Sequence, residues 1–186
     1  ILQFTDKRHT ILTFIISLIE KGMEGNYDVC FDLISLLDLS EEFIQHSIDK
    51  GLAQHLFTLF LNSSLPFNTR TTCLSAICQL VQFGNMAQIQ YFLSLGFFDV
   101  IEDWMSTFMA CIPHQILDTF ETLIIFSETN EECREWSELI FDNETILECL
   151  QKASDKEYNL RHDEYDIDVD THAQSVLVRR YNMLSP

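Results

Sequence analysis

Residues 85–127, NMAQIQYFLSLGFFDVIEDWMSTFMACIPHQILDTFETLIIFS, decide the fold, because they predict three consecutive helices. A short amphipathic helix over 86–95 precedes Gly96, and an apolar helix over 97–109 follows it. Glycine can adopt the left-handed conformation that ends a helix, so Gly96 marks the first corner. The third helix is predicted over 113–126. Together these helices form one complete structural repeat.

The same plan occurs earlier in the chain, with helices predicted over 41–50, 52–61 and 68–83. A shift of 45 positions aligns identical residues: Ile44 with Ile89, Gln45 with Gln90, and Gly51 with Gly96. Stacked helices with a period of about 40 to 47 residues are typical of HEAT and armadillo repeats. The sequence therefore predicts an all-α, armadillo/HEAT-like right-handed α-solenoid of about three to four repeats.

Further helices are predicted on both sides of these two copies. The expected ranges are 9–22, 28–39, 131–141, 144–153 and 171–184. We expect three regions: armadillo-like repeats over 1–153, an acidic loop or linker over 154–170, and a C-terminal helix over 171–186 that caps the solenoid.

Composition favours one helical domain, because 47% of the 186 residues are apolar and only 5 are glycine and 3 proline. The strongest apolar run, 11–19, is too short to span a membrane. No cleavable signal peptide is predicted, although the first residue is Ile1 rather than Met, as in a piece of a longer protein.

The six cysteines are scattered singly through predicted helices, without a Cys-x-x-Cys or Cys/His cluster. Cys73 and Cys78 are about 140° apart around a helix, so they do not share a face. Reduced packing cysteines are therefore expected, which places the protein in the cytoplasm, the nucleus or both.

The formal net charge of −18 is concentrated in residues 99–170. That segment has 20 Asp and Glu against four Lys and Arg, whereas residues 50–98 contain no acid. Such an acidic surface repels phosphate backbones, which argues against nucleic acid as a partner and favours basic peptides or protein faces. A solvated acidic face that serves solubility is the alternative.

Residues 69–126 resemble two adjacent C-terminal armadillo repeats of the importin alpha family. The resemblance rests on Ala76-Ile77 followed by Gly84-Asn85, on AQIQYFLSLG at 87–96, and on FETLI at 120–124. The segment SELIFDNETILECLQ, at 137–151, is similar to the start of the final repeat of that family. The resemblance covers about 43–152 and implies a protein that carries nuclear localisation signals.

That family binds extended basic peptides through a tryptophan on each third helix and an asparagine four residues later. The resemblance places Ser75 with Gln79, and Asp118 with Thr122, at these positions. Neither pair keeps the tryptophan or the asparagine, so binding of nuclear signals does not follow from the fold. These four residues and Glu121 are the candidate partner-binding positions on the concave face, where Asp118 and Glu121 would attract basic cargo by charge.

No catalytic residue, cofactor or metal site is predicted. Asp166, Asp168 and Asp170 begin like a calcium loop, but Thr171 stands where that loop needs glycine. The histidines lack the spacing of a zinc pair. An unrecognised long-range catalytic constellation is the enzyme alternative.

Three classes of function remain. The first is a non-catalytic module that binds a protein or extended peptide on its concave face. The second is a nuclear import adaptor that binds basic nuclear localisation signals, and the third is a structural subunit of a larger assembly.

Overall fold

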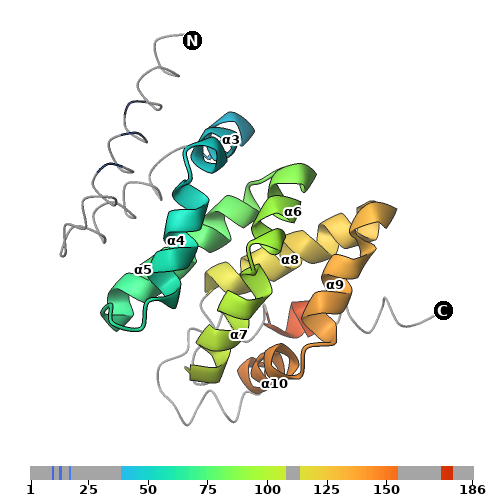
Figure 1. Cartoon of the computed structure of the whole chain (residues 1–186). Helices are drawn as coiled ribbons and strands as arrows, with labels where there is room; N and C mark the ends of the chain where they lie inside the picture. The colour runs from blue at the N-terminus through green and yellow to red at the C-terminus, as the bar shows by residue number, and fades with distance from the viewer. Residues whose placement is uncertain are drawn as a thin grey trace. The chain divides into compact units, whose positions relative to one another are not determined.

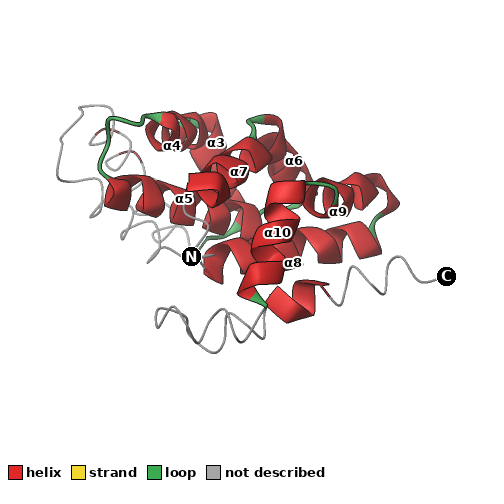
Figure 2. Ribbon diagram, turned by 90° about the horizontal axis from the view of Figure 1, so that it is seen from below, coloured by secondary structure: helices red, strands yellow, loops and turns green. Residues whose placement is uncertain are grey.

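The computed structural model describes residues 39–107, 114–154 and 173–177, together with Thr10, Thr13 and Ser17. The chain divides into two compact units, Ile1–Gly96 and Phe97–Pro186. The described residues form helices joined by short loops (Figure 1), and Figure 2 shows no strand among them. Within this part of the chain, no helix is long and apolar enough to cross a membrane.

In the first unit, the described helices follow the plan predicted from the repeat. They are α3 (Glu41–Asp49), α4 (Leu52–Leu61), α5 (Phe67–Gln82) and α6 (Met86–Ser94). α4 lies along α5, α3 contacts α4, and α6 contacts α5. Their fully buried side chains include Ile44, Leu52, Phe60, Ile77, Ile89 and Phe92.

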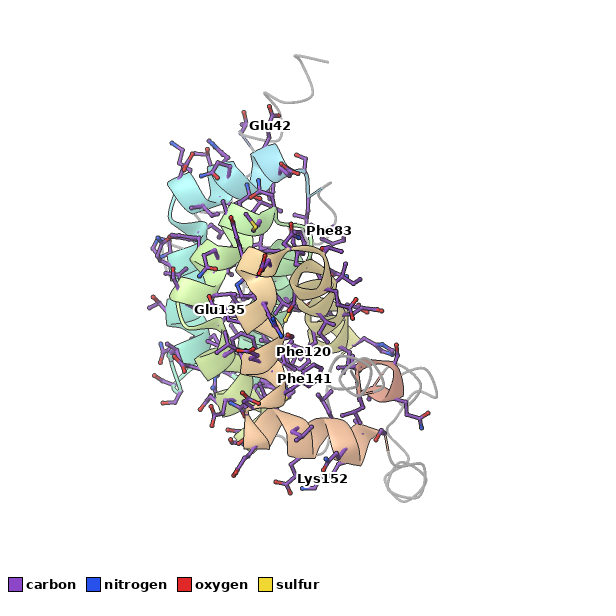
Figure 3. The ribbon with its side chains drawn as sticks, turned by 90° about the vertical axis from the view of Figure 1, so that its right-hand side faces the viewer. Glu42, Phe83, Phe120, Glu135, Phe141 and Lys152 are labelled. Atoms are coloured by element: carbon purple, nitrogen blue, oxygen red, sulfur yellow. The ribbon has the colours of Figure 1, made fainter. Side chains whose placement is uncertain are left out.

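The second unit contains the next helices of the series. They are α7 (Phe97–Thr107), α8 (His114–Thr129), the 3-10 helix η1 (Glu131–Cys133), α9 (Arg134–Phe141) and α10 (Glu144–Ala153). α8 packs against η1 and α9, and α7 contacts α10. The buried side chains at its centre include Phe97, Phe120 (labelled in Figure 3), Leu123, Trp136, Ile140 and Leu150.

Capping side chains and glycines begin and end these helices. The hydroxyl of Ser40 caps α3 by accepting from the Phe43 amide at 3.4 Å. Gly51 and Gly96 have positive φ angles of 78° and 91°, so both corners use the left-handed conformation. Asn85 caps α6, and Gln88 completes a capping box by accepting from the Asn85 amide at 3.0 Å.

Two boundaries differ from the prediction by more than one residue. α8 continues to Thr129 instead of ending near residue 126, because the Asn130 amide donates to the Phe126 carbonyl at 2.9 Å and prolongs the helical bonding. Residues 131–133 form a 3-10 turn before α9 instead of belonging to it.

Some predictions fall outside the described residues. These are the helices over 9–22 and 28–39, apart from helical Thr10, Thr13 and Ser17 and from Leu39, which is described and not helical, and the acidic loop over 154–170 beyond Ser154. Of the predicted last helix, residues 173–177 are described and helical, with Ala173 and Val176 buried.

Candidate functional site

The third helices of the two copies, α5 and α8, bury the same positions at a spacing of 43 residues. In α5 these include Cys73, Leu74, Ala76, Ile77, Leu80 and Val81; in α8 they are Ile116, Leu117, Thr119, Phe120, Leu123 and Ile124. This register makes Ser75 equivalent to Asp118 and Gln79 equivalent to Thr122. The candidate residues therefore occupy matching positions on matching helices.

On α5, Ser75 and Gln79 lie one helical turn apart and are both partly exposed. The side-chain oxygen Oε1 of Gln79 is buried and accepts no hydrogen bond from any residue that the structure describes. By contrast, Thr71 and Thr72 donate their hydroxyl hydrogens to the carbonyls of Phe67 and Asn68. On this face the Gln79 oxygen is thus a buried acceptor without a donor among the described residues.

On α8, the partly exposed residues Asp118, Glu121 and Thr122 share one face at spacings of three and four. The Thr122 hydroxyl donates to the Asp118 carbonyl at 3.0 Å, so its oxygen can only accept from a ligand. Carboxylates also only accept when ionised. This set is chemically suited to a ligand rich in donors, such as a basic side chain.

The structure brings each set together on its own helix, and the two sets belong to different units. Ser75 and Gln79 form a neutral surface, whereas Asp118, Glu121 and Thr122 form an acidic one. They are two candidate surfaces with different chemistry.

The sequence prediction missed large apolar side chains that are exposed beside these sets. Phe83, one turn after Gln79, is 52% exposed, and Ile125, one turn after Glu121, is 43% exposed. These apolar residues stand three or four positions after a candidate residue in the sequence, and this spacing could have identified them.

The described residues offer little nucleophilic or metal chemistry. The described cysteines Cys73, Cys78, Cys133 and Cys149 are buried thiols. Burial raises the pKa of the Cys133 thiol above its ordinary value, and the charges of Glu132 and Glu135 raise it further. Such a thiol stays protonated and is a poor nucleophile at neutral pH. In this part of the chain, no group of three His, Cys, Asp or Glu side chains could hold a metal ion.

Comparison with known proteins supports the fold. No protein-family model matches the chain, and no curated protein matches it either. Among solved structures, the chain is similar to computationally designed armadillo repeat proteins for modular peptide recognition, with a TM-score of 0.61 and 17% identity. The match covers 89% of this chain and 62% of the designed one. The predicted armadillo-like α-helical repeat fold is therefore confirmed.

A second designed armadillo repeat protein matches with a TM-score of 0.47 and 16% identity, over 93% of this chain and 90% of that one.

Proposed function

We propose that this chain is a non-catalytic interaction module whose third helices, α5 and α8, each bind an extended peptide or a protein segment on the exposed face. The observation that carries the proposal is the shared register of the two faces. Each third helix buries one side completely and presents polar side chains at one-turn spacing on the other. The designed proteins with this fold were made for peptide recognition, which supports the same use here.

The α8 face defines the chemistry that we propose for the ligand of that helix. Asp118 and Glu121 would attract a lysine or arginine side chain, and Thr122 would accept a further hydrogen bond. The acidic charge of the whole chain favours the same kind of ligand by raising its local concentration.

The test is binding of a labelled lysine-rich peptide of the nuclear-localisation type, compared with a scrambled peptide of the same composition. At about 0.15 M salt, where the Debye length is about 8 Å, only short-range contacts should survive screening. We expect selective binding to persist there and to weaken about tenfold in the Asp118→Asn, Glu121→Gln variant, since a tenfold change corresponds to about 1.4 kcal/mol.

The matched control removes two exposed acids at the end of α9, through Glu138→Gln and Asp142→Asn at the C-cap, and should leave the selectivity unchanged. Equal, salt-sensitive binding of both peptides would show attraction by net charge alone and would contradict the proposed site on α8.

A nuclear import adaptor is a second candidate, and the acidic α8 face is the observation that favours it. In that case the carboxylates would take over the attraction that the missing tryptophan and asparagine pairs provide in importin alpha. Both proposals place the protein in the cytoplasm, the nucleus or both. Nuclear uptake of a cargo that carries the bound peptide, and its loss in the double α8 variant, would separate the adaptor from the simpler module.

A structural subunit of a larger assembly is the third candidate. The exposed large apolar side chains favour it, since such groups are often covered by a partner. They are Leu61, Phe67, Phe83, Met86, Ile125 and Leu139. Stoichiometric co-purification with a fixed partner, unaffected by peptide competition, would support this candidate over the other two.

A further inference from the structure

We infer that the exposed face of α9 docks a basic amphipathic helix of a partner protein. This face is formed by Glu135, Glu138, Leu139 and Asp142, the last of which stands at the C-cap of α9. The inference concerns a different helix and a different shape of partner from the peptide that we propose for the third helices, and it does not depend on that proposal.

The four residues of the α9 face share one side of the helix, because they are three and four positions apart. Glu135 is labelled in Figure 3. The positions between them face the interior of the unit, where Trp136, Ser137 and Ile140 are buried. The α9 face is therefore a continuous exposed stripe that places one apolar side chain among three carboxylates.

The corresponding helix of the preceding repeat, α6, shows that the repeat does not require charge at these positions. The two helices bury the same pattern at a spacing of 48 residues: Gln88, Ile89 and Phe92 in α6, and Trp136, Ser137 and Ile140 in α9. In this register the equivalents of the four residues of the α9 face are Ala87, Gln90, Tyr91 and Ser94. None of these side chains is acidic, so the carboxylates are a property of α9 itself.

Leu139 gives the α9 face an apolar centre for a partner to cover. Its equivalent in α6, Tyr91, is tied to α4, because its hydroxyl accepts from the side-chain amide of Gln54. A leucine has no polar group that could make such a bond, and Leu139 is 46% exposed. Burial of this side chain by a partner would remove apolar area from water and favour binding.

The carboxylates of the α9 face stand where they disfavour the helix in the isolated chain. Glu138 and Asp142 are four residues apart, and like charges at this spacing repel each other. Both lie at the C-terminal end of α9, where the helix dipole is negative, and the last turn has no basic residue. No described basic side chain forms a salt bridge with Glu135, Glu138 or Asp142. Positive charges from a partner would relieve this repulsion, and local rules of stability are typically broken at functional sites.

The spacing of the α9 face specifies a helical partner. Side chains three and four residues apart form a stripe on any helix, as Glu135, Leu139 and Asp142 do on α9, so that two helices can pack with matching rows of side chains. An aliphatic side chain of the partner would then contact Leu139, while lysines or arginines one turn to either side would reach the carboxylates. The eight residues of α9 correspond to about 12 Å, which is about two turns of the partner helix.

The probe is a fluorescein-labelled, alanine-based helical peptide that carries one leucine with lysines three and four residues to each side. Two control peptides have the same net charge. In the first the same residues are scrambled so that the lysines surround the helix, and in the second two prolines prevent helix formation. Binding to the full chain is measured by fluorescence anisotropy at about 0.15 M NaCl, where the Debye length is about 8 Å. We expect the helical peptide to bind about tenfold more tightly than either control peptide.

Substitutions in the chain locate the binding surface. The affinity for the helical peptide should fall about tenfold in the Glu138→Gln, Asp142→Asn variant and about fivefold in Leu139→Ala, since charge attraction and apolar contact are lost respectively. The matched controls are the α8 variant Asp118→Asn, Glu121→Gln, which removes as many charges from the same unit, and Ile125→Ala, which removes an exposed apolar side chain from α8. Neither control should change the affinity, and circular dichroism checks that every variant keeps the fold.

The opposite outcomes are recognisable. Equal binding of the helical and scrambled peptides would show attraction by net charge alone, and equal binding of the proline-containing peptide would show that the surface takes an extended segment. A loss of affinity in the α8 variant instead of the α9 variants would move the contact to the third helix. Each of these results, or no binding of the helical peptide, would overturn the inference. The proposed function is judged separately, because there the α8 variant is the one expected to lose binding and the α9 variant is the control.

Discussion

Gly84 shows how a single residue can be required for its small size. Its φ is not positive, unlike that of Gly51 and Gly96, so the left-handed conformation does not explain it. A Cβ atom at Gly84 would lie 3.1 Å from the Leu80 carbonyl oxygen and 3.4 Å from side-chain atoms of Gln88 and Ile89. The closest of these atoms belongs to the backbone, which cannot move aside as a flexible side chain would.

We therefore expect Gly84→Ala to lower the free energy of unfolding by about 1 kcal/mol. Alanine would gain about 0.4–1 kcal/mol from the unfolded state, whereas overpacking costs about 1–3 kcal/mol, so the strain should win. Urea unfolding followed by circular dichroism measures the change. An alanine variant as stable as the parent would show that α5 and α6 can separate at this point without cost.

The residues of the candidate site differ in how far sequence alone could identify them. Ser75, Gln79, Asp118 and Thr122 follow from the resemblance, and the buried register of α5 and α8 places them at equivalent positions. The exposure of Phe83 could not be predicted in the same way. It depends on which side chain packs there from the next helix, and phenylalanine at helical spacing normally belongs to the core.

At the scale of elements, the helix boundaries could be predicted where the signal is local. Gly51 ends α3, and Asn85 begins α6 through its own side chain. The end of α8 could not be predicted from the sequence. Residues 126–129 contain no helix-breaking residue that would mark a boundary, and contacts with α9 fix the extra turn. There the Ser127 hydroxyl donates to the Ser137 hydroxyl at 2.8 Å, and the Ser137 hydroxyl donates to the Arg134 carbonyl at 3.0 Å.

The connection between α3 and α6 gives a prediction about Gln88. This 3% exposed side chain accepts from the Asn85 amide through Oε1 and donates to the Glu41 carbonyl through Nε2 at 2.8 Å. Gln88→Glu keeps the capping acceptor but replaces the donor with a second oxygen that faces the carbonyl. We expect a loss of at least about 2 kcal/mol in unfolding free energy, since a buried carboxylate without its partner is costly.

A matched variant separates the effect of the added charge from the effect of the lost hydrogen bonds. Gln88→Met keeps most of the volume and loses both hydrogen bonds without adding charge, so it should cost less than Gln88→Glu. Raising the acidity of the medium towards pH 4 should restore part of the stability of Gln88→Glu by protonating its carboxylate. If Gln88→Glu is as stable as the parent because glutamate favours capping boxes, then the bond to α3 contributes nothing.

At the scale of the whole molecule, charge is the feature that composition already reveals. The net charge of −18 places like charges close together in the folded chain, and the described acids Glu128, Glu131, Glu132, Glu135 and Glu138 follow one another within a short segment. Among the described residues an ion pair links Lys152 and Glu148 at 2.7 Å, but it is exposed and contributes little. Self-repulsion should therefore reduce the stability of the folded chain.

We expect the thermal unfolding midpoint to rise by about 2–4 °C between 0.02 and 0.3 M NaCl, which corresponds to about 1 kcal/mol for a chain of this size. Two single-charge variants test the cause. Glu138→Gln removes an acid near the negative end of the α9 dipole and should raise the low-salt midpoint. Glu144→Gln removes an acid from the first turn of α10, where a negative charge is favourable, so the midpoint should rise less or fall. Both should reduce the salt response, since both lower the total charge. A midpoint that does not change with salt would mean that repulsion is equally strong in the unfolded chain, so that charge affects binding without limiting the stability of the fold.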